Sequence, residues 1–172
     1  LKEIFPKSKI LILEKGSLPS GASTKNAGFA CFGSITEIID DLQNHSESEV
    51  ISLIKKRKEG LDYLRNLVGD KNLNFKQNGG FEIFPKKDND IFENCLLKLK
   101  EINNFLRHLF PSNVFEIKEN TFGFNQVINK LILNPHEGQL DTGMMMEALI
   151  DKVKRTNIKI LNNVNVKSFL EN

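Results

Sequence analysis

A short aliphatic run that ends in a carboxylate is the feature that most limits what this chain can fold into. Residues 9–13 read Lys-Ile-Leu-Ile-Leu and are followed directly by Glu14. Continuous aliphatic side chains bounded by Pro6 and Gly16 predict a parallel strand that is buried on both faces. In a dinucleotide-binding fold, a carboxylate at the end of the second strand accepts hydrogen bonds from a ribose. The run therefore predicts an α/β chain with a nucleotide site at Glu14.

A loop of small residues follows the predicted strand. Residues 21–28 read Gly-Ala-Ser-Thr-Lys-Asn-Ala-Gly, and Ser23 is a suitable N-cap for a short helix that begins there. Such a loop lets backbone N–H groups approach a pyrophosphate at a helix N-terminus. An ordinary capped turn has the same composition, but the position of the loop after Glu14 favours contact with a dinucleotide, and with FAD in particular.

The dinucleotide-binding pattern is incomplete. A Rossmann unit opens with a strand and a G-x-G-x-x-G turn before its first helix. This sequence contains no G-x-G, and its residues 1–5 are expected to be the end of that helix. We therefore expect the 172 residues to be a fragment whose first strand and turn lie upstream. The isolated chain is then expected to bind FAD weakly or not at all, to lack turnover, and to be marginally stable or to self-associate through open sheet edges.

Composition limits the classes of partner. The net charge is +2 and the lysines are interspersed with acidic residues, which argues against nucleic acid or an anionic membrane as partner. No apolar run reaches the ~18–20 residues of a membrane span. Cys31 and Cys95 lack metal-ligand spacing, which favours a reducing cytoplasm over a disulfide framework. His45, His108 and His136 share no helical face, so no metal site is expected.

Hydrophobic periodicity predicts three longer helices. They cover residues 46–68, 90–110 and 141–155. The first opens with a capping box formed by Ser46 and Glu49. Residues 73–84, with two glycines in their middle, predict a hairpin. Further short strands are expected at four places, residues 114–117, 131–133, 158–161 and 164–169.

These residues resemble the FAD-dependent amine oxidoreductases, the family that includes D-amino-acid oxidase, glycine oxidase and sarcosine oxidase. The match begins at Glu14-Lys15 and continues through residues 21–28. Residues 134–141, Asn-Pro-His-Glu-Gly-Gln-Leu-Asp, are similar to the family's P-x-x-G-x-(L/I)-(D/N) segment, and residues 158–166 to a pair of strands that flanks the adenine. Order and spacing agree over nearly the whole chain, which corresponds to the N-terminal half of a family member.

The resemblance implies a role for each matched residue. Glu14 would bind the adenosine ribose, and Lys15 and the backbone of Val166 would lie beside the adenine. The small-residue loop would divide between two parts of the FAD: Ser23, Thr24 and the backbone of Ala22 at the pyrophosphate and ribityl chain, and Lys25, Asn26, Ala27 and Gly28 beside the flavin. Because no histidine adjoins Asn26, the FAD is expected to be non-covalent. Cys31 is expected to be a small buried residue, with a thiol beside the flavin as the alternative.

The resemblance also implies a fold and an activity. The fold class is α/β: residues 1–70 and 141–172 form an incomplete Rossmann-like FAD-binding domain, and residues 71–140 form an inserted α+β portion of the substrate domain. The family oxidises a small amine or amino acid by passing a hydride to the flavin, and no catalytic residue can be named here. Two alternatives stay open. One is a non-catalytic remnant or interaction module without cofactor; the other is a related enzyme acting on a modified tRNA base, which a net charge of +2 does little to support.

Overall fold

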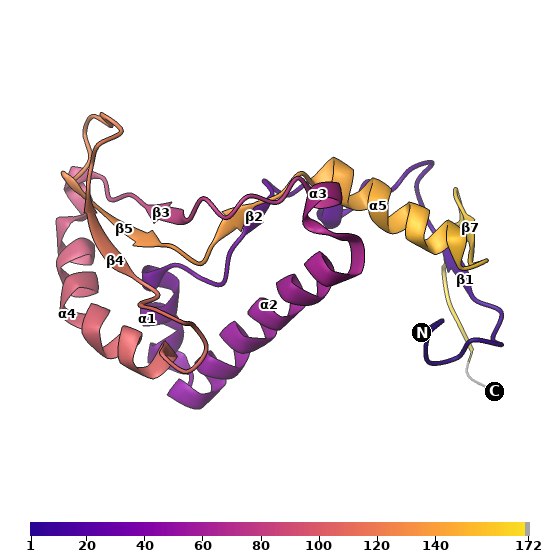
Figure 1. Cartoon of the computed structure of the whole chain (residues 1–172), viewed down its shortest axis with the longest axis horizontal. Coiled ribbons are helices and arrows are strands. Elements are labelled where there is room, and N and C mark those ends of the chain that lie inside the picture. Colours follow the sequence, from indigo (N-terminus) through magenta and orange to yellow (C-terminus); the bar gives the residue numbers. More distant parts are fainter. Residues whose placement is uncertain (171–172) are drawn as a thin grey trace.

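The computed structural model describes residues 1–170, which contain five α-helices and seven short strands (Figure 1). The strands are β1 (Leu11–Leu13), β2 (Phe29–Ala30), β3 (Gly80–Glu82), β4 (Glu116–Glu119), β5 (Lys130–Asn134), β6 (Gly138–Gln139) and β7 (Lys159–Leu161). The helices are α1 (Ile35–Asn44), α2 (Glu47–Val68), α3 (Asp70–Leu73), α4 (Asn89–Leu106) and α5 (Thr142–Arg155), with 3-10 turns η1 (Ala22–Thr24) and η2 (Lys86–Asp88).

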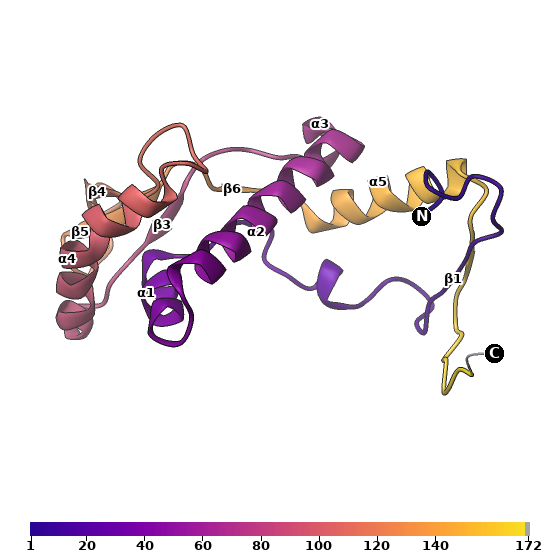
Figure 2. The same ribbon diagram turned by 90° about the horizontal axis from the view of Figure 1, so that it is seen from below.

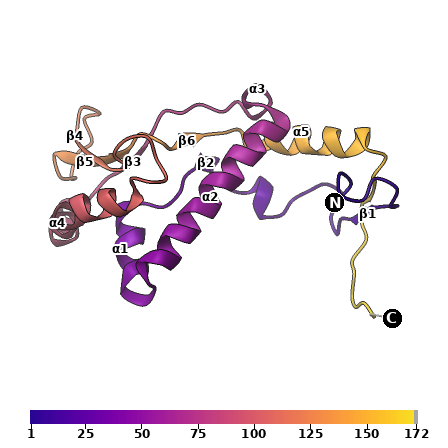
Figure 3. The same cartoon turned by 60° about the horizontal axis from the view of Figure 1, so that its bottom comes forward.

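The molecule is elongated (Figures 1 and 2). One end holds an antiparallel sheet in the order β3-β5-β4 together with α1 and α4, and the other holds the parallel pair β1–β7 beside α5. The antiparallel pair β2–β6 lies between the two ends. Helix α2 runs from α1 toward α3, which packs on α5 (Figure 3). The two ends are therefore connected by α2 with α3 and by the β2–β6 pair.

The main hydrophobic core lies at the end that holds the three-stranded sheet. Its buried side chains come from α1, α2, α4, β5 and the adjoining loops: Phe32, Ile35, Ile38, Val50, Ile54, Phe84, Phe92, Cys95, Ile102, Leu106, Phe110, Val114, Phe115 and Ile132. Removal of such apolar surface from water is the dominant favourable term in folding. The domain division at residues 70 and 140 stays a prediction, and any division has to account for a core that residues 32–54 share with residues 84–132.

The local signals at helix ends are read well from the sequence. The capping box of α2 is confirmed: the Ser46 hydroxyl accepts from the amide of Glu49, whose carboxylate accepts from the amide of Ser46. Helix α1, which the periodicity did not identify, opens with the same spacing, a capping box formed by Ser34 and Glu37. Each box satisfies N–H groups that have no partner within the helix.

The hairpin predicted over residues 73–84 is wrong. Leu73 ends α3, and Gly80–Glu82 forms β3, which pairs antiparallel with β5. The two glycines do not form a turn; their lack of side chains lets other residues pack against the backbone there. A Cβ on Gly79 would lie 2.7 Å from Leu133 Cδ1, and one on Gly80 would overlap the Glu137 carboxylate. The strand predicted at residues 164–169 is also absent from the described residues, where that stretch is irregular.

The aliphatic strand β1 is parallel to its neighbour, as predicted, and that neighbour is β7, but the predicted burial is wrong. Leu11 is 50% exposed, and Ile12 and Leu13 are also exposed. Within residues 1–170, β1 and β7 are each other's sole hydrogen-bonded neighbours, so the outer edge of each strand stays open. Residues 1–5 form a turn closed by a hydrogen bond from the Phe5 amide to the Leu1 carbonyl, 2.7 Å, where a helix end was expected.

Replacing Gly60 by alanine is expected to raise the free energy of unfolding by about 0.5–1 kcal/mol, because glycine in a helix interior costs about that much relative to alanine. Gly60 lies inside α2, and a Cβ added there meets no atom within 4 Å. Urea unfolding of Gly60→Ala beside the wild type measures the gain. A loss of stability would show that this face of α2 packs against something.

None of the helices within residues 1–170 combines the length and the apolar character of a membrane span.

Candidate functional site

Glu14 lies where β1 ends, beside the end of β7. Its amide donates to the Leu161 carbonyl at 2.8 Å, and its carbonyl accepts from the Val164 amide at 2.9 Å. The side chain turns back on the next loop, where Oε1 accepts from the Gly16 amide at 2.7 Å. Within residues 1–170, no protein group donates to Oε2. A half-buried carboxylate with one free oxygen at the carboxyl end of a parallel strand is suited to accept a hydroxyl donor.

A cavity of about 280 Å³ adjoins this carboxylate. Its walls come from β1, β7, the loop before η1, η1 itself and α5: Ile12, Glu14, Pro19, Gly21, Ser23, Thr24, Met146, Leu149, Ile150, Val153 and Ile160. The apolar side chains of α5 thus lie across the cavity from the aliphatic side chains of the strands. Ligand sites of this kind combine apolar walls with a few placed polar groups.

The loop before β2 is held by hydrogen bonds within itself. The Thr24 hydroxyl donates to the Gly21 carbonyl at 3.0 Å, the Asn26 amide group donates to the Ser23 carbonyl at 2.9 Å, and the Gly28 amide donates to Asn26 Oδ1 at 2.9 Å. The expected N-cap at Ser23 is wrong: Gly21 is the N-cap of η1, and Ser23 lies inside that turn. Ser23 lines the cavity, and its hydroxyl forms no hydrogen bond within residues 1–170.

The residues predicted from the sequence divide into two groups. Glu14, Ser23 and Thr24 line one cavity. The other predicted residues are distributed around it: Lys15, Ala22, Lys25, Asn26 and Ala27 are exposed, Gly28 is buried, and Val166 is 56% exposed beyond β7. Helix α5, which was predicted as a helix but not as part of the site, supplies a whole wall of the cavity. Its apolar face at Met146, Leu149, Ile150 and Val153 was a readable signal.

The donor set fits an adenine dinucleotide. Glu14 offers an acceptor where ribose hydroxyls need one. The amides of Ala22 and Ser23 donate no hydrogen bond within residues 1–170, and both residues are exposed. Free amides in a turn of small residues suit a pyrophosphate. Gly16, whose amide binds Glu14, also lies close to the backbone of Leu18. A Cβ on Gly16 would lie 2.8 Å from the Leu18 carbonyl oxygen.

Glu137 is a partly buried carboxylate that was not selected from the sequence. Its Oε1 accepts from the Phe32 amide at 3.0 Å. Burial raises the pKa of the Glu137 carboxyl above its usual value, and the amides of Phe32 and Gly33 offset part of that rise. Arg57 reaches the same loop, because its Nη1 donates to the Phe32 carbonyl at 2.9 Å. Residues distant in the sequence therefore fix the chain just after β2.

Cys31 lies in that loop and is exposed, so the expectation of a buried residue is wrong. Partial desolvation of the thiol, together with the carboxylates of Glu137 and Glu37, raises the pKa of Cys31. Because the thiolate is the reactive form, a raised pKa makes this thiol a poor nucleophile at neutral pH.

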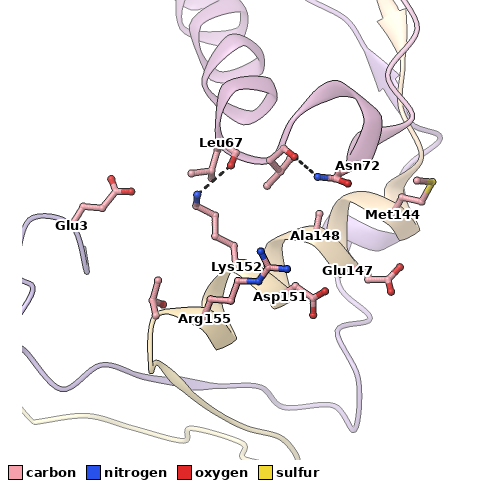
Figure 4. Close-up of a pocket in the computed structure, with 11 residues that line it drawn as sticks. Glu3, Leu67, Asn72, Met144, Glu147, Ala148, Asp151, Lys152 and Arg155 are labelled. Carbon is pink, nitrogen blue, oxygen red and sulfur yellow. Dashed lines mark hydrogen bonds between the residues drawn. The ribbon is translucent and has the colours of Figure 1, made fainter.

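A second, larger cavity of about 590 Å³ lies where α2, α3 and α5 meet (Figure 4). Lys152 Nζ donates to the Leu67 carbonyl at 3.2 Å, and Asn72 Nδ2 donates to the Val68 carbonyl at 2.6 Å. Both bonds satisfy carbonyls at the end of α2 that lack partners within the helix. The cavity is lined by none of the site residues predicted from the sequence, and it lies where three helices pack together. Within residues 1–170, no cluster of three or more His, Cys, Asp or Glu suited to a metal ion occurs.

A family model described as "FAD dependent oxidoreductase" matches residues 5–172. Solved structures of similar fold include the L-amino acid deaminase of Proteus myxofaciens in complex with anthranilate, with a TM-score of 0.62 and 14% identity, covering 92% of this chain and 34% of that one. The L-amino acid deaminase of Proteus vulgaris with its specific insertion deleted has a TM-score of 0.59 and 13% identity, and the match covers 94% of this chain and 40% of that one. Glycine oxidase from Geobacillus kaustophilus has a TM-score of 0.56 and 18% identity, and the match covers 92% of this chain and 41% of that one.

At these identities the structural likeness shows the fold alone, which is α/β. The chain spans 34% to 41% of the three structures. No curated protein matches the sequence.

Proposed function

Because the chain belongs to the family of FAD-dependent oxidoreductases, we propose that it holds the adenosine half of FAD and borders the flavin in an enzyme that oxidises a small amine or amino acid. The observation that carries this proposal is the convergence of Glu14, Ser23 and Thr24 on one cavity between the strand pair and α5. Residues matched to the family from sequence alone, nine and ten positions apart, thus border a common space.

Each residue has a proposed task. Glu14 accepts from the adenosine ribose, with Lys15 and the backbone of Val166 beside the adenine. The amide of Ala22 and the side chains of Ser23 and Thr24 face the pyrophosphate and ribityl chain. The stretch Lys25-Asn26-Ala27-Gly28 runs beside the flavin. Binding is proposed to be non-covalent, because Asn26 stands where some family members have the histidine that tethers their flavin, and no histidine lies near it in the sequence.

The flavin, when bound, supplies a two-electron acceptor for a hydride from the carbon next to the substrate nitrogen, and water then hydrolyses the resulting imine. The part of this chain is to bind and orient, because placing the reacting C–H bond over the ring accounts for much of the rate. No side chain among residues 1–170 is assigned to the chemical step. The proteins of similar fold act, by their names, on L-amino acids and on glycine, which supports an amino acid as substrate.

Flavin binding by the protein expressed from its native gene tests the proposal. We expect visible flavin bands after addition of FAD, and a dissociation constant at least about tenfold higher for Glu14→Gln, because a charge-assisted hydrogen bond contributes about 1.5–3 kcal/mol. The control is Glu147→Gln on the exposed side of α5, which should bind as the wild type does. A folded protein without flavin bands would favour the alternative, a non-catalytic module that kept the fold.

Two further properties are proposed with this function. A cytoplasmic location is supported by two free cysteines, Cys31 and Cys95. Self-association is supported by the open edge of β1 and the exposed side chains of Leu11 and Leu13. Sedimentation of the chain over a range of concentrations measures the second.

A further inference from the structure

The carboxylate of Glu137 is held between two segments that are distant in the sequence. On one side its Oε1 accepts from the Phe32 amide at 3.0 Å. On the other it lies against the backbone of Gly80 so closely that a Cβ there would overlap Oε2. A glycine at position 80 is therefore the residue that leaves room for this carboxylate.

Glu137 stands at the end of a row of contacts that holds β2. The Leu140 amide donates to the Gly28 carbonyl at 2.8 Å, and β6 pairs with β2 at Phe29 with Gln139 and at Ala30 with Gly138. Glu137 directly precedes β6, and its side chain continues the row to the Phe32 amide. Since β2 and β6 form a pair of two residues each, this side-chain bond is a large share of what fixes the chain from residue 28 to residue 33.

That stretch begins where the proposed flavin loop ends. Gly28 closes the loop through its bond to Asn26 and is buried. Any change in the position of β2 therefore moves the end of the loop that is proposed to run beside the flavin. Arg57 Nη1 donates to the Phe32 carbonyl, so the side chains of Glu137 and Arg57 hold both backbone polar groups of Phe32.

We propose that Glu137 is a positioning residue, which fixes residues 28–33 against β6 and thereby sets the flavin-side loop for FAD. The inference rests on the proposed function, since it assigns Glu137 a role toward the same cofactor. Glu137 contacts only protein groups in this role and takes no part in the chemistry. An ordinary surface carboxylate would be solvated, whereas burial raises the pKa of this one and its bond to Phe32 spans 105 positions of the sequence.

Amide hydrogen exchange of the cofactor-free chain, followed by mass spectrometry of peptides covering residues 28–33, tests the positioning directly. For Glu137→Ala we expect exchange in this stretch to rise about tenfold or more, the equivalent of a lost hydrogen bond to a charged group. Peptides from α1 should be unchanged. Glu137→Gln keeps an acceptor oxygen, so its exchange rate over residues 28–33 should lie between those of Glu137→Ala and the wild type. The control is Glu93→Gln on the exposed face of α4.

Titration with FAD of the same substitutions, made in the protein expressed from its native gene, separates the inference from the function on which it rests. If the wild type binds FAD, Glu137→Ala should bind at least about tenfold more weakly, and Glu137→Gln should recover part of that loss. Faster exchange without any change in FAD affinity overturns the role toward the flavin. Unchanged exchange in Glu137→Ala overturns the positioning itself. A folded wild type that binds no FAD overturns the proposed function and the cofactor role with it, while the exchange data still decide whether Glu137 holds residues 28–33.

Discussion

Replacing Asn103 by alanine is expected to lower the free energy of unfolding by about 3–5 kcal/mol, because three buried backbone groups would lose their partner at once. Asn103 lies in α4 and is 7% exposed. Its Oδ1 accepts from the amides of Val114 and Phe115, each at 2.9 Å, and its Nδ2 donates to the Phe115 carbonyl at 2.9 Å. Alanine is the better helix former, so the loss has to come from the broken bonds.

Urea unfolding of Asn103→Ala measures the loss, and the neighbouring Asn104 provides a matched control. Asn104 is exposed and forms no hydrogen bond through its side chain within residues 1–170, so Asn104→Ala should stay within about 0.5 kcal/mol of the wild type. Equal effects of the two substitutions would mean that the loop at residues 114–115 does not depend on α4.

This pair of asparagines shows where the sequence stops being informative. Asn103 and Asn104 are adjacent and chemically identical, and helical periodicity alone does not tell which one meets a loop that follows the helix. By contrast, the signals at Ser46 and Gly69 act within one turn of the chain, so the sequence predicts where α2 begins and ends. Local hydrogen bonds are readable because both partners lie within a few residues.

Strand pairing is the part of the fold that the sequence predicted least well. Gly79 and Gly80 have the composition of a turn, yet their lack of side chains admits Leu133 and Glu137. The choice between these uses of glycine depends on what approaches from elsewhere. The aliphatic run of β1 correctly predicted a parallel strand, but it did not identify β7 as the partner, and the predicted burial of β1 is wrong. Burial depends on how many elements cover the strand.

The candidate site also combines residues that were predicted from the sequence with residues that were not. Glu14 and the small-residue loop follow one another in the sequence, and the order strand, carboxylate, loop is itself the signal. Helix α5 borders the same cavity from far along the chain, and its apolar face indicated packing without saying against what. Glu137 had no signal, because a carboxylate in a loop is ordinarily solvated and only the pairing of β2 with β6 brings it to Phe32.

Replacing Gly28 by alanine is expected to lower the free energy of unfolding by about 2–4 kcal/mol, with strain and a lost strand contact as the causes. Gly28 has a φ of +76°, and a Cβ there would overlap the carbonyl oxygen of Leu140. That carbonyl is backbone, so it gives way only if the Leu140 amide also leaves the Gly28 carbonyl, to which it donates at 2.8 Å. The substitution therefore strains the residue and opens the β2–β6 pair together.

Gly21→Ala is the matched control, because it adds the same methyl group seven residues earlier in the same loop. A Cβ on Gly21 meets no atom within 4 Å, and its φ of −79° is ordinary for alanine, so its stability should equal or slightly exceed that of the wild type. Urea unfolding compares the two. If they unfold alike, the β2–β6 contact does not contribute to stability. If Gly28→Ala alone is destabilised, the close contact between the backbones of Gly28 and Leu140 is what attaches the loop after Glu14 to β6.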